Sequence, residues 1–230
     1  SKEMAIKRFY SLERKLSRDE KLKFEYTKFI NEYERLGHME LVEGKENDND
    51  NGVYYIPHHA VLKESSTTRL RVVFDASAKS NNGTSLNDKL KVGPTVQDNL
   101  FNILMRFRKH NFVIVGDIEK MYRQVWVHEN FRNLQRIIWR DDTGDPLKEY
   151  RLKTVTYGTG PASFLATRCL KQLYLENVKD YPEAARAINE DFYMDDLITG
   201  CKTEQELVAL KGDICKILGS AGFNLRKFAC

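Results

Sequence analysis

Apolar residues recur at every third or fourth position through the first 37 residues, a spacing that predicts two helices. The two apolar stripes consist of Ala5, Phe9, Leu12 and Leu16, and of Leu22, Tyr26, Phe29, Ile30 and Tyr33. Asp19 is placed to cap the second helix, and Gly37 is placed to end it. The other positions are dense in Lys, Arg and Glu, which favours a solvated helical face over a nucleic-acid surface.

Runs of β-branched and aromatic residues predict strands after these helices. Val53–Ile56 is a predicted strand that ends at Pro57. Ala60–Lys63 and Leu70–Phe74 are the arms of a predicted hairpin with basic residues around its tip. The polar, turn-rich stretch Glu43–Gly52 is a predicted loop, and it lacks the periodic ligands and terminal Glu of a calcium loop.

Helical and extended patterns alternate through the rest of the chain. Phe112–Val115 is continuously apolar, which is typical of a strand covered on both faces. Thr203 and Glu206 have the spacing of a capping box at a helix start. Further strands are predicted at Val125–Val127, Leu134–Trp139, Tyr150–Val155 and Phe223–Phe228, and helices at Val96–Arg108, Pro161–Val178, Pro182–Ile188 and Thr203–Leu218.

Two adjacent carboxylates interrupt the apolar segment Phe192–Ile198. In a flat strand, neighbouring side chains point to opposite faces, so either Asp195 or Asp196 would face the core as an unpaired charge. A tight turn that brings both carboxylates to one side removes this problem, and a divalent cation that neutralises them removes it more completely. Alone, the pair is also consistent with an ordinary hairpin turn.

Asp117 supplies a third carboxylate where the strand Phe112–Val115 emerges. We place it and the Asp195–Asp196 pair on two adjacent strands of one sheet. Magnesium keeps waters and substrate phosphates in its shell and uses few protein carboxylates. Three acids therefore predict a paired-magnesium site for nucleotidyl transfer, although Asp117 alone is consistent with a strand-end turn residue.

Composition narrows the class of protein without identifying it. The 230 residues carry a formal net charge of +4, which permits nucleic-acid contact and does not require it. No apolar run approaches the roughly 20 residues of a membrane helix, and the first residues lack the apolar core of a signal peptide. Cys169, Cys201, Cys215 and Cys230 form no C-x-x-C pair, so free thiols in a reducing compartment are expected.

Several motifs, taken in order along the chain, resemble those of reverse transcriptases. Tyr193–Asp196 is similar to the Y-x-D-D motif, with Met in the variable position as in retroviral enzymes. Asp117–Tyr122 is similar to the first aspartate motif, in which an aromatic follows the Asp by five residues. The resemblance covers nearly the whole chain. Several segments resemble the BEL/Pao class of LTR retrotransposons, namely the N-terminal helices, Leu70–Ala78, Leu86–Asp88, Val92–Pro94 and Val155–Thr159.

The resemblance implies an α+β fold with the fingers and palm of a right-hand polymerase, in which helices flank an antiparallel palm sheet and the thumb is missing. The expected domains are a helical segment at 1–42, fingers at 43–111 with the basic hairpin at about 60–75, and a palm at 112–230 with an interleaved fingers segment. Because the sequence ends at Cys230, we expect a fragment of a longer Pol polyprotein or a truncated genomic copy.

The activity implied by the resemblance is RNA-directed DNA polymerisation, in which two magnesium ions support transfer of dNTPs onto a primer 3′-hydroxyl. Asp117, Asp195 and Asp196 would be catalytic and, with Ile118, would hold the two Mg²⁺ ions, for which Mn²⁺ is a substitute. Tyr193 and Met194 would lie near the primer end.

The partners implied are a primed RNA or DNA template, dNTPs, and the protease, RNase H and integrase of the Pol polyprotein. A cytoplasmic retroelement particle or the nucleus is the expected location, without secretion and without membrane attachment.

The resemblance also assigns residues to the nucleotide pocket, namely Lys63, Arg71, Tyr122, Tyr157 and Gly158. A guanidinium can bind phosphate oxygens through two hydrogen bonds, and the ring of Tyr122 would clash with a ribose 2′-hydroxyl and favour dNTPs. Lys227 matches a basic residue that protonates pyrophosphate, with Arg226 as a competing candidate. The chain departs from the family pattern at Gly160–Ser163, where the proline comes earlier than usual.

Two other functions are consistent with much of this sequence. An RNA-dependent RNA polymerase would use the same carboxylates, but Tyr122 argues against it because such an enzyme must admit the 2′-hydroxyl. A catalytically decayed or domesticated copy would bind nucleic acid or a partner without polymerising, and the intact aspartates argue against it. Comparison of rNTP with dNTP incorporation distinguishes the first alternative, and magnesium-dependent dNTP binding distinguishes the second.

Overall fold

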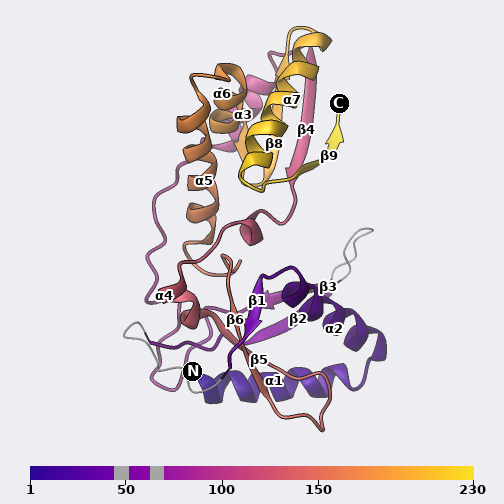
Figure 1. Ribbon diagram of the computed structural model, residues 1–230, viewed down its shortest axis with the longest axis vertical. Coiled ribbons are helices and arrows are strands. Elements are labelled where there is room, and N and C mark those ends of the chain that lie inside the picture. The colour runs from indigo at the N-terminus through magenta and orange to yellow at the C-terminus, as the bar shows by residue number, and fades with distance from the viewer. Residues whose placement is uncertain (44–51, 63–69) are drawn as a thin grey trace. The chain divides into compact units, whose positions relative to one another are not determined.

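The computed structural model describes residues 1–43, 52–62 and 70–230 and contains two compact units of mixed helix and strand (Figure 1). Unit 1 comprises Ser1–Val92 and Trp126–Ala162, and unit 2 comprises Gly93–Val125 and Ser163–Cys230. Each unit is therefore built from two separate stretches of chain, and each has its own apolar core.

The two predicted N-terminal helices are confirmed in unit 1. Helix α1 spans Lys2–Leu16 and packs on strands β2 and β5, while α2 spans Glu20–Arg35 and packs on β1 and β3. The Asp19 carboxylate caps α2 by accepting a hydrogen bond from the Leu22 amide at 2.9 Å. The predicted apolar stripes are the buried faces of these helices, because helix formation here depends on burial of one face.

Two antiparallel sheets lie beneath these helices in unit 1. One has the strand order β1-β6-β5, with β1 at Met39–Leu41, β6 at Lys148–Leu152 and β5 at Arg136–Trp139. The other pairs β2, His58–Leu62, with β3, Leu70–Phe74, which confirms the predicted hairpin pairing. The hairpin tip at 63–69 and most of the predicted loop at 43–52 lie outside the described residues.

Two of the predicted strands, Val53–Ile56 and Val125–Val127, do not form. Val53–Ile56 contributes only an isolated bridge from Tyr55 to Arg136, because the facing chain is a turn of 3-10 helix, η2, at Asn133–Gln135. Val125–Val127 contributes only a bridge from Trp126 to Thr154. The chain on either side of it is helical, with η1 at Met121–Gln124 and α4 at Glu129–Arg132, so no longer ladder forms.

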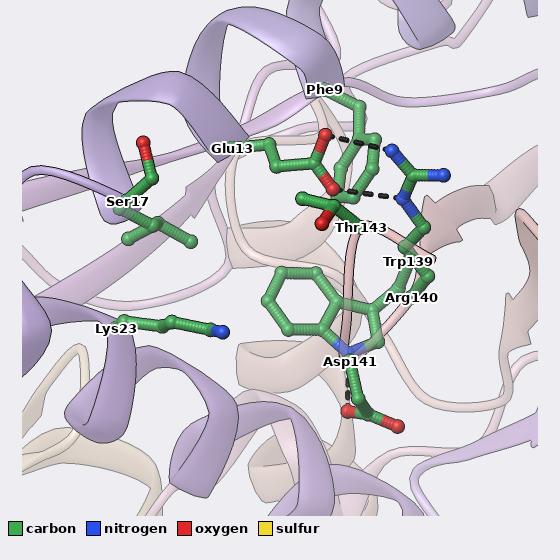
Figure 2. Close-up of a pocket in the computed structure, with 9 residues that line it drawn as sticks. Phe9, Glu13, Ser17, Lys23, Trp139, Arg140, Asp141 and Thr143 are labelled. Atoms are coloured by element: carbon green, nitrogen blue, oxygen red, sulfur yellow. Dashed lines mark hydrogen bonds and ion pairs between the residues drawn. The ribbon is translucent and has the colours of Figure 1, made fainter. Parts of the chain in front are cut away.

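Aromatic side chains fix α1 and α2 onto β5. The Trp139 ring stacks on Tyr26 with 5.4 Å between ring centroids, and Phe9 meets it edge-on at 5.7 Å. Figure 2 shows the small pocket beside this cluster, where the Arg140 guanidinium forms two hydrogen bonds of 2.8 and 2.9 Å to the Glu13 carboxylate. This two-point ion pair and the aromatic contacts together hold α1 in place.

Unit 2 is built on a four-stranded antiparallel sheet with the order β7-β8-β4-β9. Its strands are β7 at Phe192–Tyr193, β8 at Asp196–Cys201, β4 at Phe112–Ile118 and β9 at Leu225–Ala229. Its helices are α3 at Leu100–Phe107, α5 at Ala162–Asn177, α6 at Pro182–Glu190 and α7 at Glu204–Ser220. Helices α5, α6 and α7 supply most of its core, and Thr203 and Glu206 form the predicted capping box.

Strand β4 is covered on one face and not on two. Its exposure alternates, with Ile114, Gly116 and Ile118 buried while Val113, Val115 and Asp117 are only half-buried. The prediction of a strand buried on both faces is therefore wrong, because this antiparallel sheet packs its helices against one face only. The other face of β4 carries Asp117.

The structure bears on the predictions about cysteines and membrane helices. All four cysteines are free thiols, as expected. Of the helices in the described ranges, none has the length and apolar content to cross a membrane.

Histidine 58 is a buried titratable group in the core of unit 1. Its Nε2 lies 2.9 Å from the Ile138 carbonyl oxygen, and its Nδ1 lies 2.6 Å from the Tyr26 hydroxyl. Because a carbonyl only accepts, Nε2 carries the proton and the hydroxyl donates to Nδ1. Burial lowers the pKa of His58 to about 4, so the side chain stays neutral in the folded protein.

We therefore predict that acid destabilises unit 1 through His58. Between pH 7 and pH 5 the unfolded state takes up a proton that the folded state excludes, which lowers the free energy of unfolding by about 2 kcal/mol. Urea unfolding followed by tryptophan fluorescence measures this, since Trp126 and Trp139 both lie in unit 1. The pH dependence should flatten in His58→Gln and persist in His128→Gln, which changes an exposed histidine. Equal pH dependence in wild type and His58→Gln would contradict the assignment.

Candidate functional site

A two-residue turn joins β7 to β8 and carries the adjacent carboxylates. Tyr193 pairs with Asp196, which leaves Met194 and Asp195 as the turn itself. Met194 has a φ of +57°, a region that costs a non-glycine residue roughly 1–3 kcal/mol. The chain reverses at Met194 and Asp195, so the predicted tight turn is present and neither carboxylate is forced into the core.

Strand β4 brings Asp117 to the same end of the sheet. Asp117 lies directly opposite Asp196 in the antiparallel ladder, and the Ile118 amide donates a hydrogen bond of 2.9 Å to the Asp195 carbonyl. Residues opposite each other in such a ladder have their side chains on one face. Burial raises the pKa of Asp196, and the negative charges of Asp195 and Asp117 raise it further. The three carboxylates are therefore close enough to repel one another.

Lys227 partly neutralises this cluster. Its Nζ donates a hydrogen bond of 2.9 Å to Asp117 Oδ2. Lys227 has a φ of +55° and lies where the pairing of β9 with β4 shifts register, at a β-bulge. A bulge redirects side chains, and here it brings Lys227 onto Asp117. The competing candidate Arg226 pairs instead with Glu119 at 3.0 Å.

The oxygen atoms of Asp117, Asp195 and Asp196 are of the type that binds a divalent cation, although the described residues contain no preformed metal-binding group. Within residues 1–43, 52–62 and 70–230, no three acidic, His or Cys side chains are arranged as a metal-binding group. Carboxylate and carbonyl oxygens are the ligands that magnesium prefers, and a cation would offset both the burial and the neighbouring charges that raise the pKa of Asp196. Ile118 has a buried apolar side chain, so its main-chain oxygen is its one possible ligand atom.

Tyr122 lies in the same unit as the carboxylates. It belongs to η1, which follows β4 directly, and its ring is half-buried against the core of unit 2. Its hydroxyl is 3.4 Å from Ser163 Oγ at the start of α5. Lys120 has a φ of +51° and turns the chain from β4 into η1. Tyr193 in the hairpin is 41% exposed.

Three of the other predicted nucleotide-binding residues lie in unit 1. Arg71 is exposed on β3, and Tyr157 is 44% exposed. Gly158 has a φ of +103°, and a Cβ there would lie 2.5 Å from the Phe74 carbonyl oxygen, so only glycine fits against the end of β3. The Asn87 side chain donates to the Gly158 carbonyl at 3.0 Å and fixes this loop. Lys63, the fifth predicted residue, is outside the described residues.

Gln97, whose side chain binds the turn, was not predicted from the sequence. Its amide forms hydrogen bonds of 2.9 and 3.2 Å with the main chain of Met194. We predicted that a helix covers Gln97, but α3 begins at Leu100, where the Asn99 side chain accepts from the Asn102 amide at 2.9 Å. The Asn99–Asn102 spacing is a capping signal that could have placed Gln97 in the preceding loop.

The carboxylates are thus assembled within unit 2, and two comparisons with known proteins bear on their function. A family model described as "Reverse transcriptase (RNA-dependent DNA polymerase)" matches residues 61–227. Among solved structures, the chain is similar to the foamy viral protease-reverse transcriptase dRH in complex with double-stranded DNA, at a TM-score of 0.63 and 16% sequence identity. No curated protein matches the chain.

These comparisons differ in what they establish. The structural match covers 86% of this chain and only 29% of the foamy viral chain, and at 16% identity it shows a shared α+β fold. The family match spans most of the sequence and includes Asp117, Asp195 and Asp196, and it supports polymerase activity in general. It confirms the resemblance to reverse transcriptases, while the BEL/Pao class stays a prediction. The chain belongs to the reverse transcriptase family.

Proposed function

We propose that this chain is the fingers and palm part of an RNA-directed DNA polymerase from a BEL/Pao-type Pol polyprotein. The observation that carries the proposal is the gathering of Asp117, Asp195 and Asp196 at one end of the β4–β8 ladder, inside the region that matches the family. In this proposal the fingers are residues 43–111 and the palm is residues 112–230, with Trp126–Ala162 as the interleaved fingers segment. The helices before residue 43 precede the fingers.

Asp117, Asp195 and Asp196, with the main-chain oxygen of Ile118, would hold two Mg²⁺ ions, for which Mn²⁺ is a substitute. When bound, such ions activate the primer 3′-hydroxyl and steady the triphosphate and the departing pyrophosphate. The sheet supports this role by fixing Asp117 and Asp196 on paired strands and Asp195 in the two-residue turn beside them. Lys227 Nζ, held beside Asp117, would donate a proton to the pyrophosphate.

The remaining site residues would bind the nucleotide and the primer. Arg71 is exposed on its strand, so its guanidinium is accessible to a triphosphate, and Lys63 would assist it. Gly158 packs tightly against the end of β3, and its backbone would line the nucleotide pocket beside Tyr157. Tyr193 and Met194 would contact the primer end.

The proposed partners are a primed RNA or DNA template, dNTPs and the other Pol domains. The foamy viral relative is described in complex with double-stranded DNA, which supports nucleic-acid binding.

Primer extension on an RNA template with magnesium tests the proposed function. We expect wild type and Asp180→Asn, a change at an exposed acid in unit 2, to extend the primer with dNTPs. Asp195→Asn should lower the rate by about 10²–10³-fold, because it removes a negative charge on which the reaction depends. Equal incorporation by wild type and Asp195→Asn would refute the metal assignment. A wild type that neither extends primers nor binds dNTPs with magnesium would favour the decayed-copy alternative.

Sugar selection tests the role of Tyr122. We predict that Tyr122→Ala raises rNTP incorporation relative to dNTP by about 10- to 100-fold, because removal of the ring admits the 2′-hydroxyl. Tyr122→Phe keeps the ring and should keep the wild-type preference, and single-nucleotide incorporation with each substrate measures both. An unchanged ratio in Tyr122→Ala would show that the ring does not select the sugar. A wild type that uses rNTPs as readily as dNTPs would favour an RNA polymerase.

A further inference from the structure

The Gln97 side chain binds both main-chain groups of one turn residue. Its Oε1 accepts a hydrogen bond from the Met194 amide at 2.9 Å, and its Nε2 donates one to the Met194 carbonyl at 3.2 Å. An amide N–H only donates and a carbonyl only accepts, so one orientation of the Gln97 amide satisfies both bonds. The two residues are far apart in sequence, and both belong to unit 2.

Met194, the residue that Gln97 binds, has a strained backbone conformation. Met194 has a φ of +57°, and Asp195 and Asp196 follow it directly. A change in the backbone of Met194 would redirect both carboxylates, because they are attached to the next two Cα atoms. An unfavourable backbone conformation persists only when the surrounding structure determines it, and the Gln97 hydrogen bonds are a direct determinant.

Gln97 is itself held by a second set of contacts at the base of the same hairpin. Asp98, its neighbour, accepts a hydrogen bond of 2.7 Å from Arg106 on α3. Arg106 also donates to the Asp191 carboxylate at 3.2 Å and to the Glu190 carbonyl. The segment from Gln97 to Arg106 therefore contacts the hairpin at its turn and at its base, and the base contacts do not depend on Gln97.

We propose that Gln97 is a positioning residue for the polymerase site, which acts by holding Met194 in its positive-φ conformation and thereby fixing Asp195 and Asp196. This inference rests on the function proposed above. Gln97 forms two hydrogen bonds with the main chain of Met194, so its effect passes through the backbone of the turn. Its loss should loosen the turn while Arg106 keeps the hairpin base in place.

Amide hydrogen exchange measured by NMR tests the contact without any need for activity. In Gln97→Ala the Met194 amide loses its acceptor and should exchange about tenfold faster or more. The Ile198 amide, which donates to the Asp191 carbonyl at 2.8 Å, should keep its wild-type exchange rate. Gln205→Ala, a change at an exposed glutamine of unit 2, should leave both rates unchanged. Unchanged Met194 exchange in Gln97→Ala would overturn the proposal.

Single-turnover incorporation tests the consequence for chemistry. Gln97→Ala should lower the maximal rate by about 10- to 100-fold through misplaced carboxylates, with little change in the dNTP concentration that gives half the maximal rate. The loss should be smaller in a Met194→Gly background, because glycine adopts positive φ without strain. The same loss in both backgrounds would overturn the proposal. An inactive wild type would contradict the proposed function, while the exchange experiment would still decide whether Gln97 holds the turn.

Discussion

Unit 2 holds three carboxylates close together although their negative charges repel one another, and this repulsion is the constraint that the rest of the unit must offset. Asp117 and Asp196 face each other across the β4–β8 ladder, and Asp195 is in the turn beside them. Burial raises the pKa of Asp196 and the charges of Asp195 and Asp117 raise it further, so the ionised cluster is unfavourable for folding. The rest of unit 2 supports it, because α5, α6 and α7 pack on one face of the sheet and the bulge in β9 brings Lys227 onto Asp117.

Backbone strain in the described residues is concentrated around this cluster. The non-glycine residues with positive φ are Lys120, Met194 and Lys227. Lys120 turns the chain into the segment that carries Tyr122, Met194 forms the turn, and Lys227 lies at the bulge that contacts Asp117. Strained residues tend to occur at functional sites, where the surrounding structure holds them in place. The three positions thus connect the backbone geometry of unit 2 to the chemistry proposed for it.

Local signals in the sequence predicted much of this fold, whereas long-range pairing decided the rest. The cap at Asp19 and the capping box at Thr203 depend on residues within one helical turn, so both were predicted correctly. The Asp195–Asp196 turn was predictable because two charges in an apolar segment need a physical explanation. The contact of Gln97 with Met194 joins residues 97 positions apart, and no local pattern encodes it. The one-sided burial of β4 likewise depends on which helices pack against its sheet.

Divalent-cation binding tests most directly whether Asp117, Asp195 and Asp196 act as one site. Titration with Mn²⁺, with free ion measured by electron paramagnetic resonance, gives affinity and stoichiometry without substrate. Wild type and Asp180→Asn should bind Mn²⁺ saturably, and Asp117→Asn should bind it about tenfold more weakly or worse, because one ligand is lost from a shared cluster. Equal Mn²⁺ affinity in wild type and Asp117→Asn would contradict the account.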